Sequence, residues 1–161
     1  MKPFRKIRGF TLLEVLIAVV VLSIGLLGGA ALNVTSLRFG HNSVLRSQAS
    51  LLAVEIVERM RLNAVQARSS AYNFALNVAL PTTATTNCEA TDVSCTPAQL
   101  AAFDRARWAT RVSALLPSGD AAIATDTSVN PARVAVTLQW DDSRGQLTAV
   151  NQTFTFNLSS L

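Results

Sequence analysis

The hydrophobic positions nearest the N-terminus form one long run. Residues 10–32 read FTLLEVLIAVVVLSIGLLGGAAL, and Glu14 is the only charged side chain among them. At the 1.5 Å rise of an α-helix this run spans about 34 Å, enough to cross the ~30 Å hydrocarbon core of a bilayer. We therefore predict a helix that lies in a membrane or in an equally apolar assembly. Gly25 and Gly29 have the GxxxG spacing of a close-packing helix face, but helix loosening or ordinary membrane-helix glycines fit them equally well.

A second helical pattern continues the first, because no proline occurs between Pro3 and Pro81. Apolar residues recur at spacings of three and four, as on one face of an amphipathic helix. These positions are Leu45, Ala49, Leu52, Ile56, Met60 and Ala64. We predict one helix from about Phe10 to about Ser70, whose second half packs its apolar stripe against a folded domain.

The middle of the chain predicts a loop followed by a shorter helix. Residues 81–97 are rich in Thr, Pro, Ala and Asn, which is typical of a loop. Thr96 followed by Pro97 is the pattern of a helix cap and first helical position. The next apolar stripe comprises Leu100, Phe103, Trp108, Val112 and Leu115. We expect this stripe to belong to the core and not to a ligand site, and we expect the helix to end at about Leu116.

The C-terminal third alternates apolar and polar residues, as half-buried strands do. Val134, Val136, Leu138 and Trp140 alternate with polar or small residues, and the same period returns from Val150 to Leu158 after a turn at 141–145. We expect an antiparallel hairpin here, with a third strand that includes Ile123. The predicted fold is α+β: a long N-terminal helix packed on a small antiparallel sheet.

The basic character of the chain comes from its first nine residues. Four of its fourteen Lys and Arg residues are Lys2, Arg5, Lys6 and Arg8, so the ten that remain balance the ten acidic residues. A basic cluster before an apolar run is a positive-inside topology signal. A body without net charge gives no support to nucleic-acid binding, and we expect no nucleic-acid partner.

Two cysteines, Cys88 and Cys95, lie in the predicted loop with six residues between them. Export of this segment would place them in an oxidising compartment, which favours a disulfide. A metal site is disfavoured, because no second ligand pair follows and His41 is the only histidine. We predict a disulfide that holds a short surface loop, and we expect no cofactor.

The junction of leader and apolar run carries the most specific motif. Lys-Ile-Arg-Gly-Phe-Thr-Leu-Leu-Glu-Val-Leu-Ile, residues 6–17, resembles the class III signal of type IV prepilins. Charged leader, glycine, aromatic residue, glutamate and apolar run all occur in register. An ordinary secretory signal has a shorter apolar core and ends in small residues. Cleavage near Ala30 and Ala31 stays open as an alternative.

The resemblance implies a processing site and an assembly residue. In that family a prepilin peptidase cuts after the glycine and methylates the new N-terminus, here between Gly9 and Phe10. Glu14 would then neutralise the Phe10 amine of a neighbouring subunit. Physical chemistry agrees with that role, because a carboxylate in an apolar setting costs a few kcal/mol and needs a partner.

The wider chain resembles the PilV-type minor pilins. The segments that carry this resemblance are 53–63, Cys95 to Asp104 with the later Trp108, and 134–142 ending in Trp-Asp-Asp. It implies a leader at 1–9, a membrane or filament-core half-helix at 10–35, and a periplasmic type IV pilin-like domain at 36–161. It also implies an inner-membrane protein with its N-terminus in the cytoplasm, which is later built into a surface pilus.

The partners implied are the prepilin peptidase, other minor pilins, the major pilin and the pilus assembly platform. A role in priming assembly, at a tip complex that supports twitching motility and adhesion, follows from the same resemblance. Two rivals share some of these features. One is a minor pseudopilin of a type II secretion system, which has the same signal, and the other is a membrane-tethered adhesin that binds through the Cys88–Cys95 loop.

An enzyme is the least supported reading of the sequence. Asp141 and Asp142 are adjacent, so on a strand they would point to opposite faces and could not act as a carboxylate pair. His41 is predicted to lie on the long helix, and the glycines at 25–29 lack the Lys-Ser/Thr ending of a phosphate-binding loop. We expect no catalytic residues.

Overall fold

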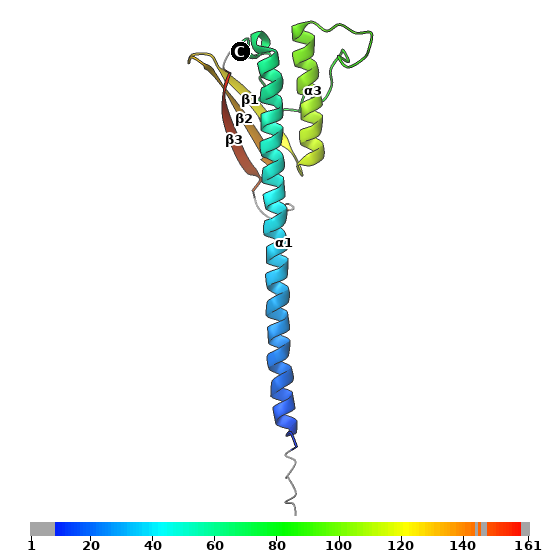
Figure 1. Ribbon diagram of the computed structural model, residues 1–161, viewed down its shortest axis with the longest axis vertical. Helices are drawn as coiled ribbons and strands as arrows, with labels where there is room; N and C mark the ends of the chain where they lie inside the picture. The colour runs from blue at the N-terminus through cyan, green and yellow to red at the C-terminus, as the bar shows by residue number, and fades with distance from the viewer. Residues whose placement is uncertain (1–8, 144, 146–147, 159–161) are drawn as a thin grey trace, which may run out of the picture. The chain divides into compact units, whose positions relative to one another are not determined.

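The computed structural model describes residues 9–143, 145 and 148–158, which divide into two compact units. The first unit ends at His41 and the second begins at Asn42. Of the predicted leader, residues 1–9, all but Gly9 lie outside the described residues. In the first unit the chain is helical from Leu12 onward, and the second unit holds the sheet and the other helices (Figure 1).

Helix α1 spans Leu12–Leu62, so it is shorter at both ends than the helix predicted from about Phe10 to about Ser70. It begins after Thr11, and it ends where the buried Asn63 leaves helical geometry, with φ −123° and ψ 51°. The Asn63 amide donates to the Pro97 carbonyl at 2.8 Å and to the Tyr72 hydroxyl at 3.3 Å. These side-chain bonds stabilise the break between the helices, and the chain continues in the short helix α2, Ala64–Arg68.

Helix α3, Pro97–Leu115, begins at the predicted cap. Thr96 and Gln99 form a capping box, in which the Gln99 N–H donates to the Thr96 hydroxyl and the Thr96 N–H donates to the Gln99 side chain. The helix is joined to α1 by the buried Trp108, whose indole N–H donates to the Leu52 carbonyl at 2.7 Å.

Three antiparallel strands form a sheet in the order β1-β2-β3. Their bounds are β1 Asp120–Asp126, β2 Ala132–Trp140 and β3 Val150–Leu158. Every second residue of β2 is buried, and the second half of α1 and α3 cover that face of the sheet (Figure 1). The predicted hairpin and the third strand containing Ile123 are confirmed, and so is the α+β fold.

The core of the second unit joins α1, α3 and the sheet. Five of the six positions predicted on the α1 stripe are buried, and Ala64 is half-buried. The α3 stripe was predicted partly wrong, since Leu115 is 39% exposed and Leu100 and Phe103 are only half-buried. Alanines and a carboxylate take the inner positions instead. The buried α3 residues are Ala101, Asp104, Ala106, Trp108, Ala109 and Val112.

A buried polar cluster centres on Asp104. Its carboxylate accepts from Arg59 Nη1 at 2.9 Å and from the Tyr72 hydroxyl at 3.0 Å. Burial raises the pKa of Tyr72, and the neighbouring Asp104 carboxylate raises it further. Glu55 extends the cluster by pairing with Arg59 at 3.3 Å and with Arg111 at 2.7 Å. The cluster therefore ties α1 to α3 by charge as well as by apolar packing.

Candidate processing and assembly site

The Gly9–Phe10 peptide bond lies just outside the first helix. Both residues precede Leu12, where α1 begins, and the Phe10 side chain is 82% exposed. A Cβ built on Gly9 would meet no atom within 4 Å. A protease binds its substrate in an extended conformation, and a bond outside the helix can adopt one without unwinding a turn. The predicted cleavage and methylation residues are therefore accessible.

Thr11 caps the helix and was missed by the sequence reasoning. Its hydroxyl accepts from the Glu14 N–H at 3.2 Å, and its carbonyl accepts from the N–H groups of Glu14 and Val15 at 3.1 and 3.3 Å. Thr-x-x-Glu is the sequence signature of such a cap, so the signal was present in the motif itself. The cap fixes the boundary between the cleavable segment and the helix.

Glu14 occupies the first turn of α1, and its side chain is exposed. A carboxylate at this place interacts favourably with the positive end of the helix dipole. Among the described residues Glu14 has no ion-pair partner within the chain. At this position the carboxylate lies at the surface of the helix.

An uncharged stretch of α1 follows Glu14. No Asp, Glu, Lys, Arg or His occurs between Glu14 and Arg38, a rise of about 36 Å in an α-helix. By length and composition α1 is apolar enough to cross a membrane, and none of its most apolar 18-residue window is buried within the structure. Ser23 and Thr35 donate their hydroxyl protons to the carbonyls of Val19 and Ala31. Both hydroxyl donors are therefore satisfied within the helix, as an apolar environment requires.

The remaining predicted site residues lie in the second unit. Cys88 and Cys95 form a disulfide with 5.7 Å between their Cα atoms, as the sequence favoured. The described residues contain no group of three or more side chains suited to hold a metal ion. His41 lies exposed on α1, at the end of the first unit.

Comparison with known families connects these features. The N-terminal stretch matches the prokaryotic N-terminal methylation motif over residues 4–30. Residues 31–106 match the Tt1218-like family, described as type IV pilin Tt1218. No curated protein and no solved structure matches the chain.

The two matches adjoin each other and cover the parts of the chain that carry the site. The first contains Gly9, Phe10 and Glu14, and the second runs from the middle of α1 into α3. A methylation motif and an apolar N-terminal helix fit a subunit that is anchored in a membrane before assembly. The family is one of structural subunits and not one of enzymes. With an α+β domain behind the helix, the chain is a type IV pilin-like protein.

Proposed function

We propose that this chain is a minor pilin of a type IV pilus. The prepilin peptidase removes residues 1–9, and the new N-terminus at Phe10 is methylated. The observation that carries the proposal is the register of the site: an accessible glycyl bond, a helix cap two residues later, and a carboxylate at Glu14 before a stretch of α1 that has no charged residue until Arg38. In this proposal the chain is cleaved after Gly9, methylated at Phe10 and paired with a neighbouring subunit through Glu14.

Glu14 is the assembly residue in this proposal. Cleavage creates an ammonium group on Phe10, and the assembled filament packs apolar helices around it. An unpaired charge in such a setting costs several kcal/mol, whereas two opposite charges can compensate one another. The Glu14 carboxylate of one subunit therefore pairs with the Phe10 amine of a neighbour and sets the axial register of the two helices.

Before assembly the protein is held in the inner membrane by residues 10–35, with residues 36–161 in the periplasm. The zero net charge of the chain beyond the leader supports this arrangement, because the four leader cations then act as the positive-inside signal. Export of the domain is supported by the disulfide in its surface loop.

A minor role is favoured over a major one by the resemblance of residues 53–63 and 134–142 to PilV-type pilins. Major pilins carry a proline in the membrane part of this helix, and its absence from residues 10–35 here points the same way. The subunit would join other minor pilins in a priming complex at the pilus tip, through the assembly platform, and so support twitching motility and adhesion.

Complementation of a deletion strain tests the proposal. Gly9→Leu should keep the leader and be absent from sheared filaments, while Glu14→Gln should be cleaved but not incorporated. Gly40→Ala is the matched control, because Gly40 also has open space around its Cβ position, and it should be incorporated normally. Incorporation of Gly9→Leu at the wild-type level would overturn the proposal.

The deletion strain itself separates pilus from secretion. Loss of twitching with normal protein secretion is the expected result. Normal twitching with a secretion defect would assign the chain to a type II secretion system instead.

A further inference from the structure

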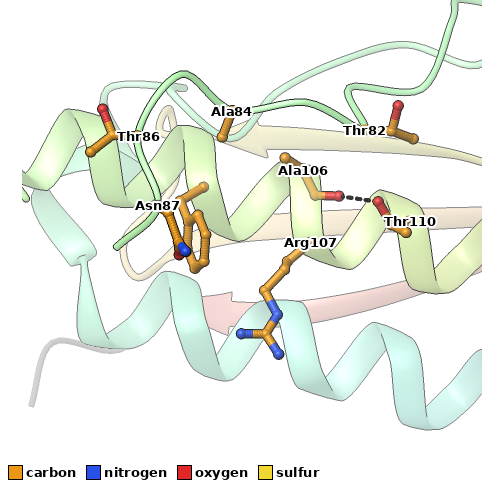
Figure 2. Close-up of a pocket in the computed structure, with 8 residues that line it drawn as sticks. Thr82, Ala84, Thr86, Asn87, Ala106, Arg107 and Thr110 are labelled. Carbon is orange, nitrogen blue, oxygen red and sulfur yellow. Dashed lines mark hydrogen bonds between the residues drawn. The ribbon is translucent and has the colours of Figure 1, made fainter. Parts of the chain in front are cut away.

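A pocket of about 170 Å³ lies between α3 and the loop that precedes the disulfide. Thr82 and Asn87 line it from the loop, and Ala106, Arg107 and Thr110 line it from the helix; Figure 2 shows where these residues lie on the two segments. Phe103 completes the apolar part of its wall. The neighbouring Cys88–Cys95 disulfide holds the loop to the start of α3, and Gln99 Nε2 of α3 donates to the Thr86 hydroxyl of the loop at 3.5 Å. The pocket is therefore formed before any ligand arrives.

The lining offers both hydrogen-bond donors and acceptors. The Thr82 hydroxyl has no partner among the described residues. The Asn87 side-chain oxygen accepts from the Glu89 N–H at 3.1 Å, which leaves the amide N–H₂ group available. Thr110 donates to the Ala106 carbonyl at 2.9 Å, so its hydroxyl oxygen presents lone pairs only. This combination suits a ligand that carries several hydroxyl groups.

Arg107 is the only charged residue in the lining, and it is positive. Its guanidinium lies 5.9 Å from the centre of the Phe103 ring and forms an ion pair with Glu89. Both partners are exposed, with 45% of the Arg107 side chain and 58% of the Glu89 side chain accessible. An exposed ion pair is worth little, so a ligand carboxylate can replace Glu89 on Arg107 at low cost.

We infer that this pocket binds a saccharide that carries a carboxylate, of the hexuronic acid class. The carboxylate pairs with Arg107 in place of Glu89, and the sugar hydroxyls bond to Asn87, Thr82 and Thr110. The pocket volume suits one sugar ring, because it lies below the 300–1,000 Å³ typical of sites for drug-sized ligands. Glu89 acts as a competitor for Arg107, and it leaves the site when the ligand binds.

Titration of the full chain in detergent with sodium galacturonate, followed by calorimetry or saturation-transfer NMR, tests the inference. Galactose and sodium acetate are titrated in parallel, because they carry the ring and the carboxylate separately. Saturable binding of galacturonate, with at least tenfold weaker binding of the other two, is the expected result. If acetate binds as tightly as galacturonate, the pocket does not recognise a sugar ring and the inference is wrong. If galactose binds as tightly, Arg107 does not recognise the carboxylate and the inference is also wrong.

Three variants locate the site. Arg107→Gln should weaken galacturonate binding at least about tenfold, because a charge-assisted pair is lost. Glu89→Gln should strengthen it several-fold, because the competing carboxylate is gone. Arg111→Gln is the matched control, since Arg111 lies one turn further along α3 and pairs with Glu55, and it should leave binding unchanged. No effect of Arg107→Gln, or weaker binding by Glu89→Gln, would overturn the inference.

The result is independent of the pilin proposal. Arg107 and Glu89 lie in the second unit, whereas the processing site lies in the first. Arg107→Gln should therefore still be processed after Gly9 and recovered in filaments. Loss of sugar binding with normal processing supports the pocket, and failure of processing in the wild-type chain would overturn the pilin proposal alone.

Discussion

Replacing Asp104 by Asn should be among the most damaging conservative changes in the second unit. Asp104 is 4% exposed, and it accepts from the Arg59 guanidinium and the Tyr72 hydroxyl. Asparagine keeps the size of the side chain and one acceptor oxygen, but it removes the negative charge. Arg59 would then lose its buried counterion and keep only the carboxylate of Glu55 at 3.3 Å.

The magnitude follows from how buried the pair is. Breaking a fully buried ion pair costs about 3–5 kcal/mol. The Arg59 side chain is 30% exposed, and it retains Glu55, so solvent and the second carboxylate screen the loss to about half of that value. For a unit of this size, a loss of about 2 kcal/mol lowers Tm by roughly 6–10 °C.

Tryptophan fluorescence during thermal or urea unfolding measures this change. Both tryptophans, Trp108 and Trp140, are fully buried in the second unit, so their emission reports its unfolding without a contribution from residues 9–41. Glu58→Gln is the matched control, because it breaks an exposed pair with Arg61 on the same helix and should cost under about 0.5 kcal/mol. Equal stabilities of Asp104→Asn and Glu58→Gln would refute the reasoning.

Three further predictions concern the second unit. Replacing Cys88 and Cys95 by Ser should lower the free energy of unfolding by ~2–3 kcal/mol, because the short loop regains its entropy in the unfolded chain. Reduction with dithiothreitol should lower the free energy of unfolding of the wild type by the same amount. Folding raises the pKa of Tyr72 above its ordinary value of 10.0. The stabilisation that comes from keeping this hydroxyl protonated is therefore complete below pH 10 and is lost as the pH rises above that value. Urea midpoints of the wild type should therefore fall above pH 10, and those of Tyr72→Phe should fall less. Gly119→Ala should cost ~1–3 kcal/mol in urea unfolding, because its Cβ would lie 2.7 Å from a backbone carbonyl oxygen at the end of α3. Gly40→Ala, which lies in the first unit, should leave the unfolding of the second unit unchanged.

Local patterns in the sequence predicted most of the fold. Thr96 and Pro97 placed the start of α3 because capping depends on neighbouring residues. The alternation from Val134 to Trp140 placed β2, because burial of one sheet face imposes a period of two. Such signals involve residues close in the chain, so the tertiary structure does not overrule them.

The errors involve residues whose partners are distant in the sequence. Asn63 ends α1 because it bonds to Pro97, 34 residues away. Asp104 occupies the inner face of α3 because Arg59 of α1 supplies its counterion. Phe103, predicted for the core, lines a surface pocket instead. No pattern within α3 alone could have predicted the positions of Asp104 and Phe103, because the contacts that determine them come from other elements.

The candidate site was only partly accessible to sequence reasoning. The motif located Gly9, Phe10 and Glu14, whose roles stay predictions, but the cap at Thr11 went unnoticed although its spacing is a known signature. The pocket beside the disulfide could not be foreseen, because it depends on how the loop folds back over α3.

The N-terminus of the mature protein tests the central claim most directly. Mass spectrometry of the membrane and sheared-filament fractions should find a chain that begins with N-methylated Phe10. Such a chain would have the ammonium group that Glu14 is proposed to neutralise. An intact Met1, or an N-terminus near Leu32, would contradict the account, because neither chain could present Phe10 to the Glu14 of a neighbouring subunit.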